Sequence, residues 1–126
     1  MAGEDRALTL REWQDAVDRQ IRGYRVKYFS PLSNLARLTE EVGELARELN
    51  HRFGEKPKKP EEAEGSVLLE LGDILYVVVC LANSLHLDLD EALSRVMEKY
   101  RTRDRNRWGH AGEVPEQQDP APGEAD

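Results

Sequence analysis

The sequence is poor in the features that mark several common classes of protein. Its single cysteine, Cys80, excludes an intramolecular disulfide and suits a reducing compartment. Its net charge of -7 at pH 7 argues against binding to a nucleic-acid polymer through an extended basic surface. Its apolar stretch at residues 67–82 is shorter than the ~20 residues of a membrane span and contains two acidic residues.

The N-terminal segment also lacks a basic stretch followed by an apolar run, so we expect no signal peptide. The chain has 126 residues, of which 39% are hydrophobic and 34% are charged, enough for one domain with a modest core. We therefore expect a cytoplasmic protein that contacts neither a membrane nor a nucleic-acid polymer.

Apolar residues recur at helical spacing along four segments, which predicts an all-α fold. The first helix begins at the capping box of Thr9 and Glu12 and is expected to end near Tyr28. The second opens with Ser30 as its N-cap and Pro31 in the first helical position. The other predicted segments are a mobile polar loop at 54–65, helices at 66–85 and 88–105, and a disordered tail at 109–126.

The third predicted helix is apolar on nearly every side, as its sequence VLLELGDILYVVVCLA (residues 67–82) indicates. Such a helix needs burial on most sides, and the rest of so short a chain can hardly surround it. We therefore expect a second copy of the chain to cover part of it, in a homodimer or a homotetramer. The fold expected for residues 1–108 is one four-helix bundle completed by oligomerisation.

Two acidic side chains interrupt this apolar helix. Glu70 and Asp73 are its only ionised side chains at neutral pH, and their i, i+3 spacing places them on one face. A carboxylate in apolar surroundings is costly unless it is paired or bound to a metal. The third helix therefore predicts a cation site.

A similar acidic segment, EEVGE, lies at residues 40–44 of the second predicted helix. Glu41 borders the apolar stripe of that helix and Glu44 follows nearly one turn later, whereas Glu40 projects further away. We expect Glu41 and Glu44 to face the third helix, and Glu40 to be solvated or to support a metal ligand.

Gly43 and Gly72, one in each acidic segment, predict a close approach of the two helices, because glycine is otherwise unfavourable inside a helix. Four carboxylates around one space favour a hard, oxygen-preferring ion such as Mg²⁺ or Mn²⁺. The alternative is a solvated acidic surface. We favour that alternative for Glu48, and the two interpretations are equally supported for Glu41 and Glu44 taken alone.

These motifs, EExxE on one helix and ExxD on the next, resemble the MazG family of all-α nucleoside triphosphate pyrophosphohydrolases. The segments YFSPLxxLARLTEEVGELARELNHRFGEKPKK and ELGDILYVVVCLANSL are similar to its short, single-domain members in particular, and the likeness covers residues 10–108. The resemblance implies hydrolysis of (d)NTPs between the α- and β-phosphates, giving a nucleoside monophosphate and pyrophosphate. It also implies a dimer or a tetramer built of dimers.

The resemblance further implies roles for individual residues. The Mg²⁺ ligands would be Glu41, Glu44, Glu70 and Asp73, with Mn²⁺ as a substitute ion. Either Glu41 or Glu44 would orient or deprotonate the attacking water.

A triphosphate also needs cationic and base-binding partners. Lys99 and Arg103 lie one turn apart near the end of the fourth helix and resemble the family's phosphate-binding positions, although they could simply stabilise the helix dipole. Trp13 could stack on a base or belong to the core. Asn83 could bind a base or sugar, or could tie the end of the third helix.

Three functions fit this pattern. The first is a Mg²⁺-dependent nucleotide pyrophosphohydrolase, which could remove non-standard nucleotides in a house-cleaning role. The second is a non-catalytic, metal-dependent nucleotide-binding module, and the third is a helical interaction protein with a structural ion. We favour the enzyme, because the chain keeps all four residues that match the family's metal ligands.

Overall fold

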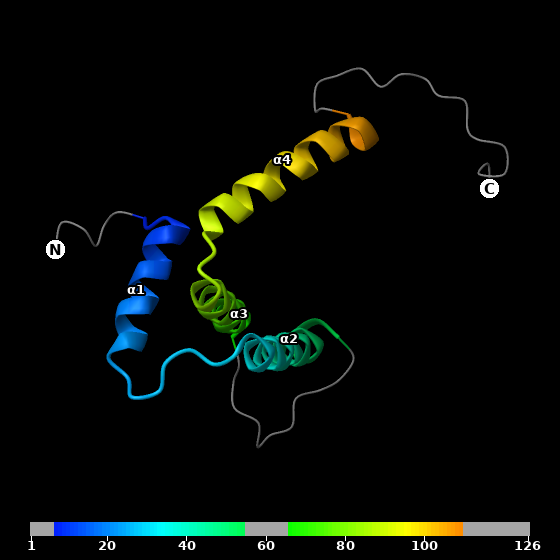
Figure 1. Cartoon of the computed structure of the whole chain (residues 1–126). Coiled ribbons are helices and arrows are strands. Elements are labelled where there is room, and N and C mark those ends of the chain that lie inside the picture. Colours follow the sequence, from blue (N-terminus) through cyan, green and yellow to red (C-terminus); the bar gives the residue numbers. More distant parts are fainter. Residues whose placement is uncertain (1–6, 55–65, 110–126) are drawn as a thin grey trace. The chain divides into compact units, whose positions relative to one another are not determined.

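The computed structural model describes residues 7–54 and 66–109, which form four helices (Figure 1). The helices are α1 (Leu10–Arg22), α2 (Pro31–Phe53), α3 (Val67–Ser84) and α4 (Leu89–Trp108). The chain divides into a first unit, Met1–Ala92, and a second unit, Leu93–Asp126, so α4 begins in the first and continues in the second. The all-α prediction is confirmed. The predicted polar loop and tail lie almost wholly outside the described residues.

The predicted starts of the first two helices are confirmed. Thr9 caps α1 through its hydroxyl, which accepts from the backbone N–H of Glu12 at 3.1 Å, and the Glu12 carboxylate accepts in return from the Thr9 N–H. Ser30 caps α2 and Pro31 occupies its first turn.

The predicted end of the first helix is wrong, because α1 stops at Arg22 rather than near Tyr28. Gly23 follows directly, and glycine is among the poorest helix formers. The Lys27 ammonium then donates to the carbonyls of Arg22 at 2.7 Å and Tyr24 at 2.8 Å, which satisfies groups that a longer helix would have paired internally.

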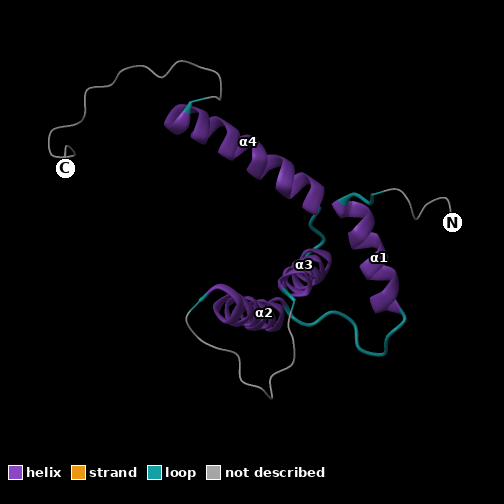
Figure 2. Ribbon diagram, turned by 180° about the vertical axis from the view of Figure 1, so that it is seen from behind, coloured by secondary structure: helices purple, strands orange, loops and turns teal. Residues whose placement is uncertain are grey.

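In the first unit, α3 lies between α1 and α2 and packs against both (Figures 1 and 2). The core is small and sits at the C-terminal half of α3, where Val77, Val79 and Cys80 are buried, with Val17 of α1 against them. Burial raises the pKa of the Cys80 thiol, so this cysteine behaves as a small apolar core residue.

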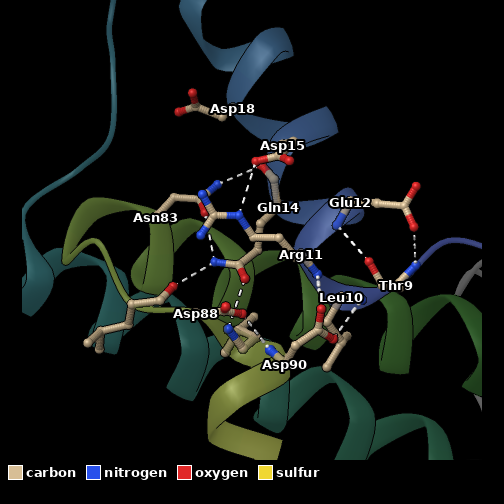
Figure 3. Close-up of polar contacts among 12 residues, drawn as sticks. Thr9, Leu10, Arg11, Glu12, Gln14, Asp15, Asp18, Asn83, Asp88 and Asp90 are labelled. Atoms are coloured by element: carbon tan, nitrogen blue, oxygen red, sulfur yellow. Dashed lines mark hydrogen bonds and ion pairs between the residues drawn. The ribbon is translucent and has the colours of Figure 1, made fainter.

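A polar network ties α1 to the end of α3 (Figure 3). The buried Gln14 amide donates to Asn83 Oδ1 at 3.0 Å and to the Leu87 carbonyl at 2.8 Å, and its Oε1 accepts from the Leu89 N–H at 2.9 Å. Asn83 Nδ2 donates to the Gln14 carbonyl and to the Tyr28 hydroxyl, both at 3.0 Å. Every heteroatom of these two amides therefore has a partner.

Two aspartates extend this network at its ends. Tyr28 donates to Asp18 Oδ1 at 2.7 Å, and burial, followed by that carboxylate, raises the pKa of Tyr28 to about 12. Asp90 accepts from the backbone N–H groups of Leu10 at 3.2 Å and Arg11 at 3.1 Å, so it caps the N-terminus of α1 from the start of α4 (Figure 3). The first contact joins α1 to the segment that follows it, and the second joins the start of α1 to the start of α4.

The N-terminal half of α3 is apolar but exposed. Leu68 is 78% exposed, Leu69 is 67% exposed and Leu75 is 60% exposed, while Leu35 and Val42 of α2 are about half exposed. Within the described residues, α3 is the one helix that could cross a membrane by length and composition, with a mean hydropathy of 1.8. Because α3 packs against two amphipathic helices and carries two acids, we assign it to the centre of a bundle.

Candidate active site

The structure brings together three of the four predicted metal ligands. One carboxylate oxygen each from Glu41 of α2 and from Glu70 and Asp73 of α3 all lie within 4.8 Å of one another. Glu41 and Glu70 are half-buried, and Asp73 is exposed. Glu70 and Asp73 are neighbours because one helical turn separates them, and the packing of α2 on α3 adds Glu41.

The direction of the two helices follows from a second contact. The Arg37 guanidinium lies over the Tyr76 ring, 5.7 Å from its centroid. Arg37 is one turn before Glu41 on α2, and Tyr76 is one turn after Asp73 on α3. The two helices are therefore antiparallel.

The surroundings of Glu70 disfavour its charged form. Partial burial, followed by the charges of Asp73, Glu44, Glu41 and Glu48, raises the pKa of the Glu70 carboxyl. A cation between these carboxylates would offset the repulsion and favour the charged form of Glu70.

The remaining glutamates of α2 differ in their surroundings. Glu44 is exposed and acts on Glu70 through its charge, although it lies outside the group of three oxygens. Glu40 is exposed. The preference for a solvated Glu48 is wrong: Glu48 is only 8% exposed, and its carboxylate is 3.9 Å from Arg52 Nε. Arg52 lies one turn after Glu48 on α2, so its positive charge can neutralise the buried Glu48 carboxylate.

The prediction that Gly43 and Gly72 mark a close approach of helices is also wrong for the described chain. A Cβ atom added at either glycine would meet no atom within 4 Å. The two helices therefore meet through their longer side chains at this level, and no steric requirement for glycine arises within one copy of the chain.

The three carboxylates fit a hard divalent cation. Magnesium binds oxygen ligands at ~2.0–2.1 Å, so two ligand oxygens on opposite sides of the ion are about 4 Å apart. Carboxylate oxygens within 4.8 Å of one another are thus close to the spacing of ligands around one such ion. The donor set contains neither sulfur nor imidazole, which favours Mg²⁺ or Mn²⁺ over zinc.

The predicted cationic residues belong to the second unit. Lys99 Nζ is 5.0 Å and the Arg103 guanidinium is 4.3 Å from the centroid of the Tyr100 ring, so both flank the same aromatic residue of α4. Arg103 also donates from Nε to Asp104 at 3.0 Å. They form one cationic face on α4, and their role toward phosphate remains a prediction.

The two predicted base-binding residues have different surroundings. Trp13 is 52% exposed, so it is not a core residue of the single chain. Asn83 is tied to Gln14 and Tyr28 by the hydrogen bonds described above, which favours its structural interpretation.

The sequence interpretation missed Gln14, Asn34 and Arg37. Each is a polar residue on a face of α1 or α2 that also carries apolar side chains, and Gln14 and Asn34 are buried. A helical projection could have placed Arg37 one turn from Glu41, but the partners of Gln14 lie 69 to 75 residues away in the chain. No local pattern reveals such contacts.

Comparisons with known proteins show the family of the chain and support its all-α fold. A family model described as the MazG nucleotide pyrophosphohydrolase domain matches residues 29–108. The uncharacterized protein YpjD of Bacillus subtilis (strain 168) is 58% identical over 100 residues, which cover 79% of this chain and 90% of YpjD.

Two solved structures are also similar. The crystal structure of YpjD from Bacillus subtilis matches with a TM-score of 0.68 and 56% identity, over 75% of this chain and 97% of that chain. A Bacillus-conserved MazG protein, described as a nucleotide pyrophosphohydrolase, matches with a TM-score of 0.66 and 48% identity, over 80% of this chain and 98% of that chain.

The fold and the acidic centre thus define an all-α hydrolase acting on phosphoanhydrides. The chain belongs to the MazG nucleotide pyrophosphohydrolase family, which confirms the resemblance drawn from the EExxE and ExxD motifs.

Adding Mg²⁺ or Mn²⁺ to metal-free protein is expected to raise its melting temperature, because the ion neutralises Glu41, Glu70 and Asp73. At a metal concentration about 100 times the Kd, binding to the folded state alone adds about 2.7 kcal/mol. For a domain of this size that stabilisation corresponds to roughly 10 °C. Thermal denaturation followed by circular dichroism, with metal and with EDTA, measures the shift.

The matched control for this measurement is Asp73→Asn, which keeps the shape of the side chain and removes one charge. It should lose most of the shift, and sodium chloride at equal ionic strength should produce none in either protein. An equal metal-induced shift in both proteins would show that the ion binds elsewhere.

Proposed function

We propose that this protein is a Mg²⁺-dependent pyrophosphohydrolase that cleaves nucleoside triphosphates between the α- and β-phosphates, giving a monophosphate and pyrophosphate. The observation that carries the proposal is the convergence of Glu41, Glu70 and Asp73 from two antiparallel helices. The membership in the MazG family and the similarity to a nucleotide pyrophosphohydrolase support the same reaction class.

In this proposal Glu41, Glu44, Glu70 and Asp73 hold the metal, with Mn²⁺ as a substitute. The bound ion supplies charge neutralisation for the triphosphate and lowers the pKa of a bound water. Glu41 or Glu44 orients the attacking water and accepts its proton. Glu44 suits the proton-accepting role, because it is exposed yet near enough to Glu70 to affect its pKa.

Lys99 and Arg103 bind the phosphate oxygens in the same proposal. Both cations lie on one face of α4, next to Tyr100, and so could contact adjacent phosphate groups.

We further propose that the protein acts in the cytoplasm on free nucleotides, in a house-cleaning role, without a membrane or a nucleic-acid polymer as partner.

We also propose that the working form is a homodimer or a homotetramer. Leu68, Leu69 and Leu75 expose much of the apolar surface of α3, and Leu35 and Val42 expose part of α2. So many exposed apolar side chains on two helices that pack together favour an interface with a further chain. A second copy that packs these helices against its own would complete the bundle.

Light scattering coupled to size-exclusion chromatography should therefore give a mass at least twice the 14.4 kDa of one chain. Leu69→Glu should shift the protein toward monomer, because it places a charge in the interface. Leu32→Glu, at a 79% exposed position in the first turn of α2, is the comparison. A wild-type protein that stays monomeric at micromolar concentration would contradict the assembly.

Release of pyrophosphate from a panel of canonical and modified NTPs and dNTPs tests the proposed reaction. We expect turnover with Mg²⁺, none with EDTA, and a ranking of bases and sugars. Tight nucleotide binding without turnover across the panel would instead identify a metal-dependent binding module.

A further inference from the structure

A cavity of about 420 Å³ opens in the first unit, among α1, α2, α3 and the segment that joins α1 to α2. Its volume falls within the ~300–1,000 Å³ of small-molecule sites. Its polar lining residues other than tyrosine are Lys27, Asn34 and Arg37. Four aromatic side chains also line it: Tyr24, Tyr28, Phe29 and Tyr76. Aromatic walls with few polar groups are typical of pockets that bind flat heterocycles.

Asn34 is the unusual member of this lining. It is only 1% exposed, and its Nδ2 donates to the Phe29 carbonyl at 3.2 Å. That bond fixes the orientation of the amide, because the reverse orientation would set two oxygens against each other. The buried Oδ1 atom then has no hydrogen-bond partner among the described residues. A buried acceptor without a partner is rare, so a bound molecule that supplies a hydrogen-bond donor would be favoured here.

The cavity lies next to the acidic centre along both helices. Two lining residues, Arg37 and Tyr76, contact each other. Arg37 is one turn from Glu41 on α2, and Tyr76 is one turn from Asp73 on α3. Asn34 precedes Glu41 by seven residues, which correspond to about 10 Å along the axis of α2. A nucleotide whose phosphates reach Glu41, Glu70 and Asp73 can therefore extend its base toward Asn34.

We propose that this cavity binds the base of the substrate and that Asn34 Oδ1 accepts a hydrogen bond from an exocyclic amine of that base. The inference rests on the proposed nucleotide substrate and adds a selectivity to it. An amine, as in adenine or cytosine, supplies the missing donor, whereas a base that presents a carbonyl or a C–H there leaves the acceptor unpaired.

Because Oδ1 is covered in the free protein, the proposal requires side chains of the lining to move when the base enters, and the half-exposed Tyr24 and Phe29 are the most exposed rings among them. The Tyr28 and Tyr76 rings, which are less exposed, stay as the walls on which the base stacks.

Pairs of nucleotides that differ only in the amine test this proposal on the wild-type protein. The probes are the α,β-methylene analogues of ATP and of purine riboside triphosphate, and the corresponding cytidine and 2-pyrimidinone analogues, titrated calorimetrically with Mg²⁺. We expect the amine-bearing member of at least one pair to bind about 10- to 100-fold more tightly. Equal affinities within both pairs, or no binding of any member, would overturn the proposal.

Asn34→Leu should abolish the preference for the amine-bearing nucleotide of each pair, mainly by weakening the binding of that nucleotide. Asn50→Leu makes the same change at an exposed position of α2 and should keep the preference. Circular dichroism establishes that each variant is folded, and the wild-type comparison decides the proposal if Asn34→Leu does not fold. If a folded Asn34→Leu protein keeps the full preference for the amine-bearing nucleotide, a residue other than Asn34 causes that preference.

Hydrolysis of the natural triphosphates, measured alongside, separates this inference from the proposed function. Turnover without any preference for an amine would overturn the role of Asn34 and leave the reaction intact. Preferential binding without turnover would support the role of Asn34 and refute the reaction.

Discussion

Asp73→Asn and Glu70→Gln are each expected to lower metal-dependent hydrolysis of nucleoside triphosphates by on the order of 10³-fold. Each change keeps the shape of the side chain and removes one anionic oxygen from the group that lies within 4.8 Å. Two carboxylates and one amide bind Mg²⁺ much more weakly than three carboxylates. The effect is measured as kcat/KM for pyrophosphate release at several Mg²⁺ concentrations.

Asp15→Asn is the matched control, since it removes one charge from an exposed residue that pairs with Arg11 on α1. Its kcat/KM should stay within about twofold of the wild-type value, in keeping with the small contribution of exposed ion pairs. Higher Mg²⁺ should partly restore the Asp73→Asn protein, because the lost interaction is one of affinity. Unchanged turnover in both metal-site variants would exclude these residues as ligands.

Gln14→Leu is expected to lower the free energy of unfolding by about 3 kcal/mol, which is large for a single substitution. The Gln14 side chain is 3% exposed and joins Asn83, Leu87 and Leu89 through three hydrogen bonds. Leucine fills a similar volume but leaves an N–H and two oxygens without partners in a partly buried place. Urea denaturation, followed by circular dichroism, measures the change.

Gln20→Leu tests whether that loss comes from burial rather than from the residue type. Gln20 also lies on α1, but it is exposed and bonds only the Tyr24 hydroxyl, at 3.0 Å, among the contacts described here. Its substitution should change the stability by less than about 0.5 kcal/mol. Equal losses for the two variants would show that the network of Gln14 and Asn83 contributes little.

Much of the fold could be predicted because helix signals are local. The capping box of Thr9 and the Ser30–Pro31 pair act within one turn, and the structure confirms both starts. The end of α1 was predicted too late because Tyr24 continues the apolar spacing beyond Gly23, whereas Lys27 closes the helix by a contact that no periodicity reveals.

The acidic centre could be predicted for a related reason. Glu70 and Asp73 stand out as charges in an apolar helix, and their proximity follows from helical spacing alone. The contribution of Glu41 required the antiparallel packing of α2 on α3, which the contact of Arg37 with Tyr76 establishes.

The burial of Asn34 and Glu48 could not be predicted, because it depends on how far each helix turns toward its neighbours. Both residues are polar members of an amphipathic helix, a setting in which solvent exposure is the usual outcome. The packing of α2 against α3 buries part of the α2 surface, and the Phe29 carbonyl in the segment before Pro31 accepts from the Asn34 amide.

The central claim is that the acidic centre supports hydrolysis between the α- and β-phosphates. A phosphorus NMR time course of a nucleoside triphosphate with the wild-type protein, run with Mg²⁺ and then with EDTA, tests it most directly. The claim predicts equal amounts of monophosphate and pyrophosphate with Mg²⁺ and an unchanged triphosphate with EDTA. Formation of diphosphate and inorganic phosphate, or equal turnover in EDTA, would contradict it.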